Sequence, residues 1–158
     1  MTRITLFLLL ALVAFALDQA TKAAALYALD LHQPVPIFPG FNLTLGFNTG
    51  ASFGMLSDLM ADTPLIMAAL TGLITLGLAW LGLRAGRAWE TAGFALIVGG
   101  SSGNIFDRLR QGAVTDFLDF YWRDWHWPTF NGADIAIFLG VAAILLAGLS
   151  HKKETGHA

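Results

Sequence analysis

The chain has 158 residues, which suits one domain, and 56% of them are hydrophobic while only 13% are charged. A soluble protein of this size carries about 25% charged residues, so this composition indicates a polytopic membrane protein. The net charge of −2 offers no basic field for nucleic acid. The absence of cysteine excludes a thiol nucleophile, a disulfide framework and a cysteine-ligated metal.

The first apolar segment, residues 4–29, is long enough for a membrane span, which needs about 20 residues. Its start, MTRITLFLLLALVAFA, also has the basic residue, apolar core and A-x-A ending of a cleaved signal peptide. The apolar character resumes after Lys22, which favours a retained span with a polar notch. Within that notch, Asp18 and Lys22 stand four residues apart, in the order that favours an ion pair.

The segment from residue 30 to residue 63 contains no lysine or arginine. Within it, FNLTLGFN at 41–48 alternates apolar residues with polar or small ones, as a half-buried strand does. The sequence TGASFGMLSDLMAD at 49–62 is typical of a turn followed by a short interfacial helix. We therefore expect a small β element and a short helix in this loop.

Three further spans are predicted at 64–83, 91–109 and 133–149. Basic residues precede the first span, fill the loop between the second and third, and follow the fourth: Arg3, Arg84, Arg87, Lys152 and Lys153. The excess of positive charge on cytoplasmic loops predicts that both termini are cytoplasmic and that the two longer loops lie outside. The fold class expected is an all-α protein of four transmembrane helices, one integral membrane domain over residues 1–158.

The second outer loop contains FYWRDWHWPTF, which is dense in tryptophan and tyrosine. Such residues favour the membrane interface, so this segment is interpreted as an interfacial belt rather than a substrate site. Asp119 and Asp124 are interpreted as solvated loop charges, and His126 as an interfacial residue.

The unusual polar residues of four segments are predicted to gather at one depth, near the outer surface. They are Asp18 and Lys22 in the first span, Asn48 in the first outer loop, Asn104, Asp107 and Arg108 on one face of the third span, Asp116 just beyond it, and Asn131 and Asp134 at the start of the fourth. Polar groups at membrane depth are costly and tend to be functional. Gly99, Gly100 and Gly103 allow the helices to approach closely.

Simpler interpretations of these residues remain open. Asp18 and Lys22 fit a structural ion pair, and Asp107 and Arg108 fit interfacial charges. Asn131 followed by an acidic residue three positions later is typical of a helix cap.

Two carboxylates near each other cannot both ionise cheaply, so one keeps a proton while the other stays charged. That asymmetry supplies a base to activate water and an acid to protonate a leaving amine. Asp116 and Asp134 are the candidates, since each stands at the outer end of an adjacent span.

Alternative chemistries and functions have weaker support. The letters around Ser101 match G-x-S-x-G, but no predicted span contains a histidine to serve as its base. The chain has no H-E-x-x-H zinc motif and no phosphate-binding glycine loop. A small non-enzymatic transporter would need polar residues through the full depth of its spans, whereas the span at 64–83 has no charge.

The ordered set of motifs resembles the lipoprotein signal peptidase (signal peptidase II) family. The four segments that carry the resemblance are DQATK at 18–22, FNTGASFG at 47–54, GGSSGNIFDRLRQGAVTDFLDF at 99–120 and FNGAD at 130–134. The departures are small: Gly132 stands where an aliphatic residue is usual, and Thr115 and Ile135 vary flanking positions. Gly132 is expected at most to loosen the entry to the fourth span.

The resemblance implies a bacterial intramembrane aspartyl protease of the cytoplasmic (inner) membrane, with its active site at the outer-leaflet face. Its substrate would be diacylglyceryl-modified prolipoprotein, cut before the lipidated cysteine, with no metal or organic cofactor and no nucleic acid. All proposed groups come from one chain, so function as a monomer is expected. The catalytic aspartates fall on Asp116 and Asp134. Residues matching the substrate-binding or supporting positions are Asn48, Asn104, Arg108 and Asn131, and those matching structural positions are Asp18, Lys22, Asp107, Gly100 and Gly103.

Overall fold

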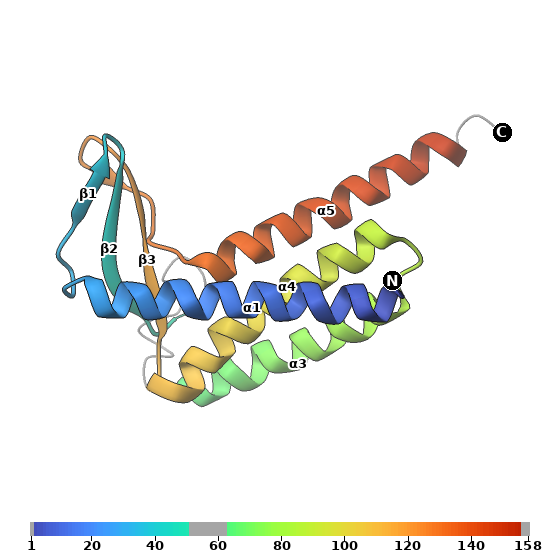
Figure 1. Ribbon diagram of the computed structural model, residues 1–158, viewed down its shortest axis with the longest axis horizontal. Coiled ribbons are helices and arrows are strands. Elements are labelled where there is room, and N and C mark those ends of the chain that lie inside the picture. The colour runs from blue at the N-terminus through green and yellow to red at the C-terminus, as the bar shows by residue number, and fades with distance from the viewer. Residues whose placement is uncertain (1, 51–62, 156–158) are drawn as a thin grey trace.

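The structure, a computed structural model, describes residues 2–50 and 63–155. Four long helices run beside one another, with a small sheet at one end of the bundle (Figure 1). The start of the first helix and the end of the last both lie away from that sheet. The helices are α1 (Arg3–Ala28), α3 (Pro64–Arg84), α4 (Ala88–Gln111) and α5 (Gly132–Thr155).

The helix boundaries follow from local signals in the sequence. Thr2 caps α1 by accepting a hydrogen bond from the Thr5 amide at 3.1 Å. Pro64 begins α3, where its missing N–H costs nothing. Gly112 ends α4 with a φ of 79°, a left-handed conformation that glycine adopts without strain. A helix covers each of the four segments predicted to be spans, except for Leu29 at the end of the first.

Two of these helices, α1 and α3, are long and apolar enough to cross a membrane, and α5 contains the shorter apolar stretch Gly132–Gly148. Helix α4 is less apolar because it carries Glu90, Asp107, Arg108 and Arg110. That all four helices cross the membrane therefore remains a prediction.

Helix α4 lies at the centre of the bundle and contacts the other three helices. A Cβ atom on Gly99 would collide with the backbone oxygen of Ala11 in α1, and one on Gly100 would lie 2.5 Å from the backbone oxygen of Ala133 in α5. A Cβ atom on Gly103 would collide with the Asp18 carboxylate. The predicted role of these glycines in close helix packing is confirmed.

Helix α1 is packed into this bundle along its length. Phe7, near its start, is buried, and its ring lies against Gly82 of α3. The first apolar segment is therefore part of the helical bundle.

The sheet has four antiparallel strands in the order β1 (Val35–Phe38), β2 (Phe41–Asn48), β3 (Val114–Trp122) and β4 (Trp125–His126). The strand predicted at 41–48 is confirmed as β2. The expected turn and interfacial helix at 49–62 fall almost wholly outside the described residues.

The interpretation of residues after 112 as a loop with an aromatic belt was incomplete, because β3 and β4 form there. Strand β3 pairs with β2, with Phe120 opposite Phe41 and Val114 opposite Asn48. The rings of Phe41 and Phe120 lie 4.7 Å apart and those of Phe120 and Phe130 lie 5.9 Å apart. Aromatic pairing across strands stabilises a sheet, which explains part of the aromatic content assigned to the interface.

The interpretation of Asp119 as a solvated charge is wrong. Its exposed fraction is only 3%, because it lies in β3 between neighbouring strands. Asp124, in the turn after β3, is exposed as expected.

Candidate active site

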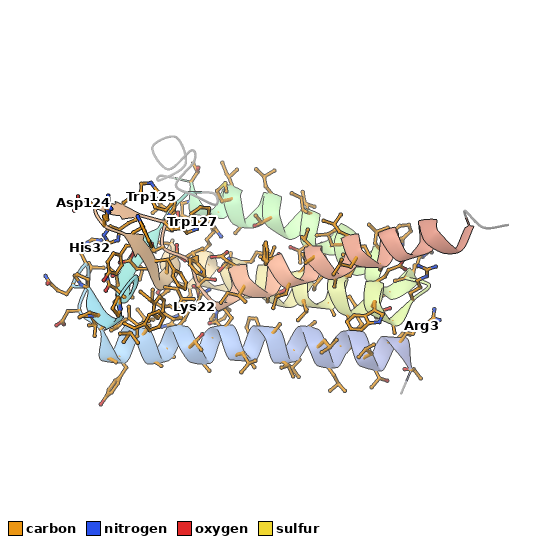
Figure 2. The ribbon with its side chains drawn as sticks, turned by 90° about the horizontal axis from the view of Figure 1, so that it is seen from above. Arg3, Lys22, His32, Asp124, Trp125 and Trp127 are labelled. Carbon is orange, nitrogen blue, oxygen red and sulfur yellow. The ribbon has the colours of Figure 1, made fainter. Side chains whose placement is uncertain are left out.

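A buried lysine joins three of the predicted polar residues where the helices meet the sheet (Figure 2). The Lys22 ammonium lies 2.9 Å from the Asp18 carboxylate and 3.0 Å from the Asp107 carboxylate. It also donates a hydrogen bond of 2.8 Å to the side-chain oxygen of Asn104. The predicted ion pair between Asp18 and Lys22 is confirmed, and Asp107 is part of it rather than an interfacial charge.

The two carboxylates of this cluster also bind backbone amides. Asp18 accepts a hydrogen bond of 2.8 Å from the amide of Ala133, at the start of α5. Asp107 accepts one of 3.0 Å from the amide of Thr115, at the start of β3. The ion cluster therefore fixes the first residues of the two elements that carry Asp134 and Asp116.

Gln19, which was not among the predicted site residues, donates hydrogen bonds of 3.1 Å from its side-chain amide to both Asp18 and Asp107. Only its position inside the DQATK segment could have indicated, from the sequence, that Gln19 belongs to this cluster.

The start of α5 is capped by two reciprocal hydrogen bonds. The Asn131 side-chain oxygen accepts from the Asp134 amide at 3.0 Å, and the Asp134 carboxylate accepts from the Asn131 amide at 3.1 Å. This arrangement is a capping box in form, so the capping interpretation is confirmed. The other oxygen of Asp134 accepts from the side-chain amide of Asn104 at 3.2 Å, so capping leaves part of this carboxylate to other partners.

Asparagine side chains connect the two candidate aspartates. The amide group of Asn131 donates to the Asp116 carboxylate at 2.7 Å and to the side-chain oxygen of Asn104 at 3.2 Å. Because Asn104 in turn donates to Asp134, a continuous path runs from Asp116 through Asn131 and Asn104 to Asp134. The second oxygen of Asp116 accepts from the side-chain amide of Asn48 at 3.2 Å.

Both aspartates line one cavity of about 490 Å³. Its polar wall also includes Asn48, Asn104 and Arg108, and the rest is mostly apolar. The apolar part is formed by β3, by the first half of α5 and by the segment that leads into α5: Val114, Trp127, Pro128, Phe130, Ile135, Ile137, Phe138 and Val141. Ser101 does not line this cavity.

Arg108 is buried beside this carboxylate pair. Its guanidinium donates to the backbone oxygens of Gly50 at 2.7 Å and Asn104 at 3.3 Å. Its Nε has no hydrogen-bond partner in the part of the chain that the structure describes. A buried donor without a partner is costly, and the Arg108 side chain that carries it lines the same cavity as the two aspartates.

Asp116 lies in β3, outside the helices, in a site that favours its neutral form. Burial, and next the nearby Asp134 carboxylate, raise the pKa of Asp116 to about 7. Hydrogen bonds from Asn131 and Asn48 and the charge of Lys22 act in the opposite direction. Near neutral pH the Asp116 carboxyl can therefore hold or release a proton, as a general acid or base must.

All nine polar residues that were predicted to gather at one depth belong to this connected site. Within residues 2–50 and 63–155, no group of three acidic or histidine side chains could hold a metal ion. A larger residue than glycine would fit at position 132, since a Cβ atom there would make ordinary contacts of 3.4 Å with Asp18 and Thr21.

Two carboxylates joined through asparagines, at one end of an apolar helical bundle, are the arrangement expected of an aspartic protease that works in a membrane. The chain matches the family model of signal peptidase (SPase) II over residues 10–150. It is 44% identical over 151 residues to the lipoprotein signal peptidase of Aeromonas hydrophila, covering 94% of this chain and 90% of the relative. It is 43% identical to that of Actinobacillus succinogenes, covering 94% and 92%.

Solved structures agree with the sequence relatives. A bacterial membrane enzyme determined by the in meso method at 2.3 Å resolution superposes with a TM-score of 0.81 at 26% identity, covering 94% of this chain and 90% of that one. A second, determined at 1.9 Å, gives 0.75 at 27% identity, covering 90% and 92%. The chain therefore belongs to the signal peptidase II family, and its fold is that of a mostly helical membrane enzyme with a small antiparallel sheet.

Replacing Lys22 with methionine keeps much of the side chain's volume but leaves Asp18 and Asp107 without their shared cation. We expect the free energy of unfolding to fall by about 3–5 kcal/mol, because breaking a buried ion pair leaves an uncompensated charge. Thermal unfolding of the purified protein in detergent measures this loss. The double variant Lys22→Met/Asp18→Asn should lose less than the sum of the two single changes. Strictly additive losses would contradict the coupling.

Proposed function

We propose that this chain is an aspartic endopeptidase that removes the signal peptide from diacylglyceryl-modified prolipoproteins, cutting before the lipidated cysteine. Membership of the signal peptidase II family supports the reaction and the prolipoprotein substrate. One observation carries the choice of catalytic residues: the hydrogen-bonded path that links Asp116 to Asp134 across a single cavity.

In this proposal the two aspartates share one proton. The ionised carboxylate takes a proton from water as the water oxygen attacks the scissile carbonyl carbon, and the protonated carboxyl donates to the carbonyl oxygen. When the C–N bond breaks, the carboxyl that took the proton of water passes it to the departing amine, and a hydroxyl of the tetrahedral intermediate gives its proton back to the other aspartate, so the pair again holds one proton. Because a coupled pair titrates as a unit, the resting proton belongs to the pair rather than to one aspartate.

The surrounding polar residues have two proposed roles. Asn48 and Asn131 orient Asp116, and Asn104 orients Asp134, since each donates a hydrogen bond to the corresponding carboxylate. Arg108 lines the cavity beside the two aspartates, so its positive charge suits it to a carbonyl oxygen of the substrate or its lipid. The cluster of Asp18, Lys22 and Asp107, with Gly100 and Gly103, holds the helices in place.

We also propose that all four helices span the bacterial cytoplasmic membrane as one domain, with both termini in the cytoplasm and the sheet outside. The basic residues support this orientation because they lie together at the end of the bundle away from the sheet, where Figure 2 places Arg3. Arg3 donates a hydrogen bond to the backbone oxygen of Ala85, between α3 and α4, and Arg87 donates one to that of Ala147 in α5. An excess of positive charge at one end of a bundle marks the cytoplasmic side. The active site needs only one chain, which supports function as a monomer.

The natural absence of cysteine makes this orientation straightforward to test. Asp124→Cys, in the exposed turn of the sheet, should react with a membrane-impermeant maleimide in intact spheroplasts. Gly86→Cys, between α3 and α4 where a new side chain meets open space, should react only after the membrane is disrupted. The unmodified chain is the control, and the reverse labelling pattern would reject the orientation.

Replacing either aspartate with asparagine keeps the shape of the side chain but removes the carboxyl that carries a proton. We expect Asp116→Asn and Asp134→Asn each to lower kcat by roughly 10²–10⁴-fold or more, because each loses its acid–base function. Cleavage of a purified lipidated prolipoprotein, followed by gel shift, measures the effect.

Ser101→Ala is the matched control and should keep most of the activity. Loss of activity in Ser101→Ala alone would favour a serine protease, and full activity in Asp134→Asn would reject the pair. A precursor without lipid should be cut poorly, whereas equal cleavage would refute the lipid requirement.

The pH profile tests whether Asp116 works as part of the pair. Because its pKa is raised to about 7, kcat should fall as the pH rises past that value and the shared proton is lost. Asn48→Ala removes a hydrogen bond that favours the ionised carboxylate, so the pKa should rise and the fall in kcat should move to higher pH. Asn42→Ala, in the same strand but bonded to Asp119, should leave the midpoint unchanged. A shift of the Asn48→Ala midpoint to lower pH would contradict this assignment.

A further inference from the structure

The proposed reaction makes no use of Asp119, although this carboxylate is buried and binds groups from two other strands. It accepts a hydrogen bond from the Thr44 hydroxyl at 2.8 Å and from the Asn42 side-chain amide at 3.3 Å, both on β2. Its other oxygen lies 2.7 Å from Nδ1 of His126 on β4. A buried carboxylate with three donors ties β2, β3 and β4 together.

The role of each partner in this contact follows from the charge on Asp119. Burial alone would raise the pKa of Asp119, but hydrogen bonds from His126, Thr44 and Asn42 outweigh it and hold the pKa below its ordinary value. An ionised carboxylate can only accept, so Nδ1 of His126 carries the hydrogen. The His126 side chain is 52% exposed, so one edge of the ring faces solvent while the other holds Asp119.

The chain that follows His126 turns back toward the active site. The Trp127 amide donates to the Phe120 backbone oxygen at 2.8 Å, and the Phe130 amide donates to the Leu118 backbone oxygen at 3.1 Å. Between these two bonds lie Pro128 and Thr129. All four residues from Trp127 to Phe130 line the cavity that contains Asp116 and Asp134.

We propose that Asp119 and His126 are positioning residues for substrate binding, because their hydrogen bond holds the cavity wall of residues 127–130 in place. The inference rests on the proposed function and adds how the site holds its substrate. The ligand of this wall is the prolipoprotein chain next to the scissile bond, since the wall borders the two aspartates.

The aspartate pair has supports that do not involve Asp119 or His126. Asp116 is held by Asn131 and Asn48, and Asp134 by Asn104 and the amide of Asn131. Loss of the Asp119–His126 bond should therefore disturb binding more than chemistry. A merely structural role would lower activity through loss of folded protein without changing the KM of what remains.

The test compares KM and kcat for a lipidated prolipoprotein in four variants. His126→Ala and Asp119→Asn should raise KM about 5- to 20-fold, as expected for a lost hydrogen bond to a charged group, and change kcat less than about twofold. His126→Asn should restore most of the wild-type KM, because its amide nitrogen can replace Nδ1 as donor. Asp124→Asn, an exposed aspartate in the same hairpin, is the matched control and should match the wild type.

Hydrogen exchange gives a readout that does not depend on activity. The amides of Trp127 and Phe130 should exchange faster in His126→Ala and Asp119→Asn than in the wild type and in Asp124→Asn, at matched thermal stability. Should His126→Ala fail to fold, Asp119→Asn and His126→Asn decide by the same two measurements.

Two results would overturn the inference: an unchanged KM in Asp119→Asn, or unchanged exchange at residues 127–130. A wild-type protein that does not cut the prolipoprotein, or an Asp134→Asn variant that does, would instead refute the proposed function. Exchange at residues 127–130 would still decide whether the Asp119–His126 bond holds the wall.

Discussion

The geometry of this site depends on the buried ion pairs that the Lys22 ammonium makes with Asp18 and Asp107. This ammonium balances Asp18 and Asp107, and each of these carboxylates uses an oxygen to bind a backbone amide, at Ala133 or Thr115. Those amides begin the two elements that carry Asp134 and Asp116. Burying three charges is expensive, so the cluster persists because each charge has close partners. Because of this desolvation cost, a buried ion cluster is a poor way to stabilise a fold alone, which is consistent with a role in orienting the neighbouring aspartates.

The cap of α5 and the hydrogen-bonded path between the two aspartates use the same side chains. Asn131 caps α5 through its oxygen and holds Asp116 through its nitrogen, so its amide serves the helix and the carboxylate at once. The positive end of the α5 dipole lies at Asp134, where it favours negative charge. The alternatives weighed from sequence, a cap or a catalytic group, are therefore compatible, because an amide side chain has both a donor and an acceptor.

The sequence predicted the helices well and the sheet poorly, for physical reasons. Length and apolar content define a helix locally, and the polar residues stood out because they interrupt apolar segments. Strand β3 gave no such signal, because its buried positions include Thr115, Asp116 and Asp119 and do not alternate simply with exposed ones. Its formation depends on pairing with β2, about 70 residues earlier in sequence, and so does the burial of Asp119. The link from Asp116 to Asp134 through two asparagines also required coordinates, since sequence gives depth but not distance.

The site is supported from two sides, and these supports are separate. From the helices, the Lys22 cluster and the asparagines hold the aspartate pair. From the sheet, Asp119 connects β2 to the hairpin that leads into the cavity wall of residues 127–130. The hairpin and the segment after it also join Asp116 to Asp134 along the chain. A shift of this segment on substrate binding would therefore be expected to change the distance between the two carboxylates. The hydrogen bonds from Asn131 to Asp116 and from Asn104 to Asp134 oppose such a change, because they hold the carboxylates directly. On the proposed function, a disturbance of the wall of residues 127–130 should therefore weaken substrate binding while the chemistry of the pair is preserved.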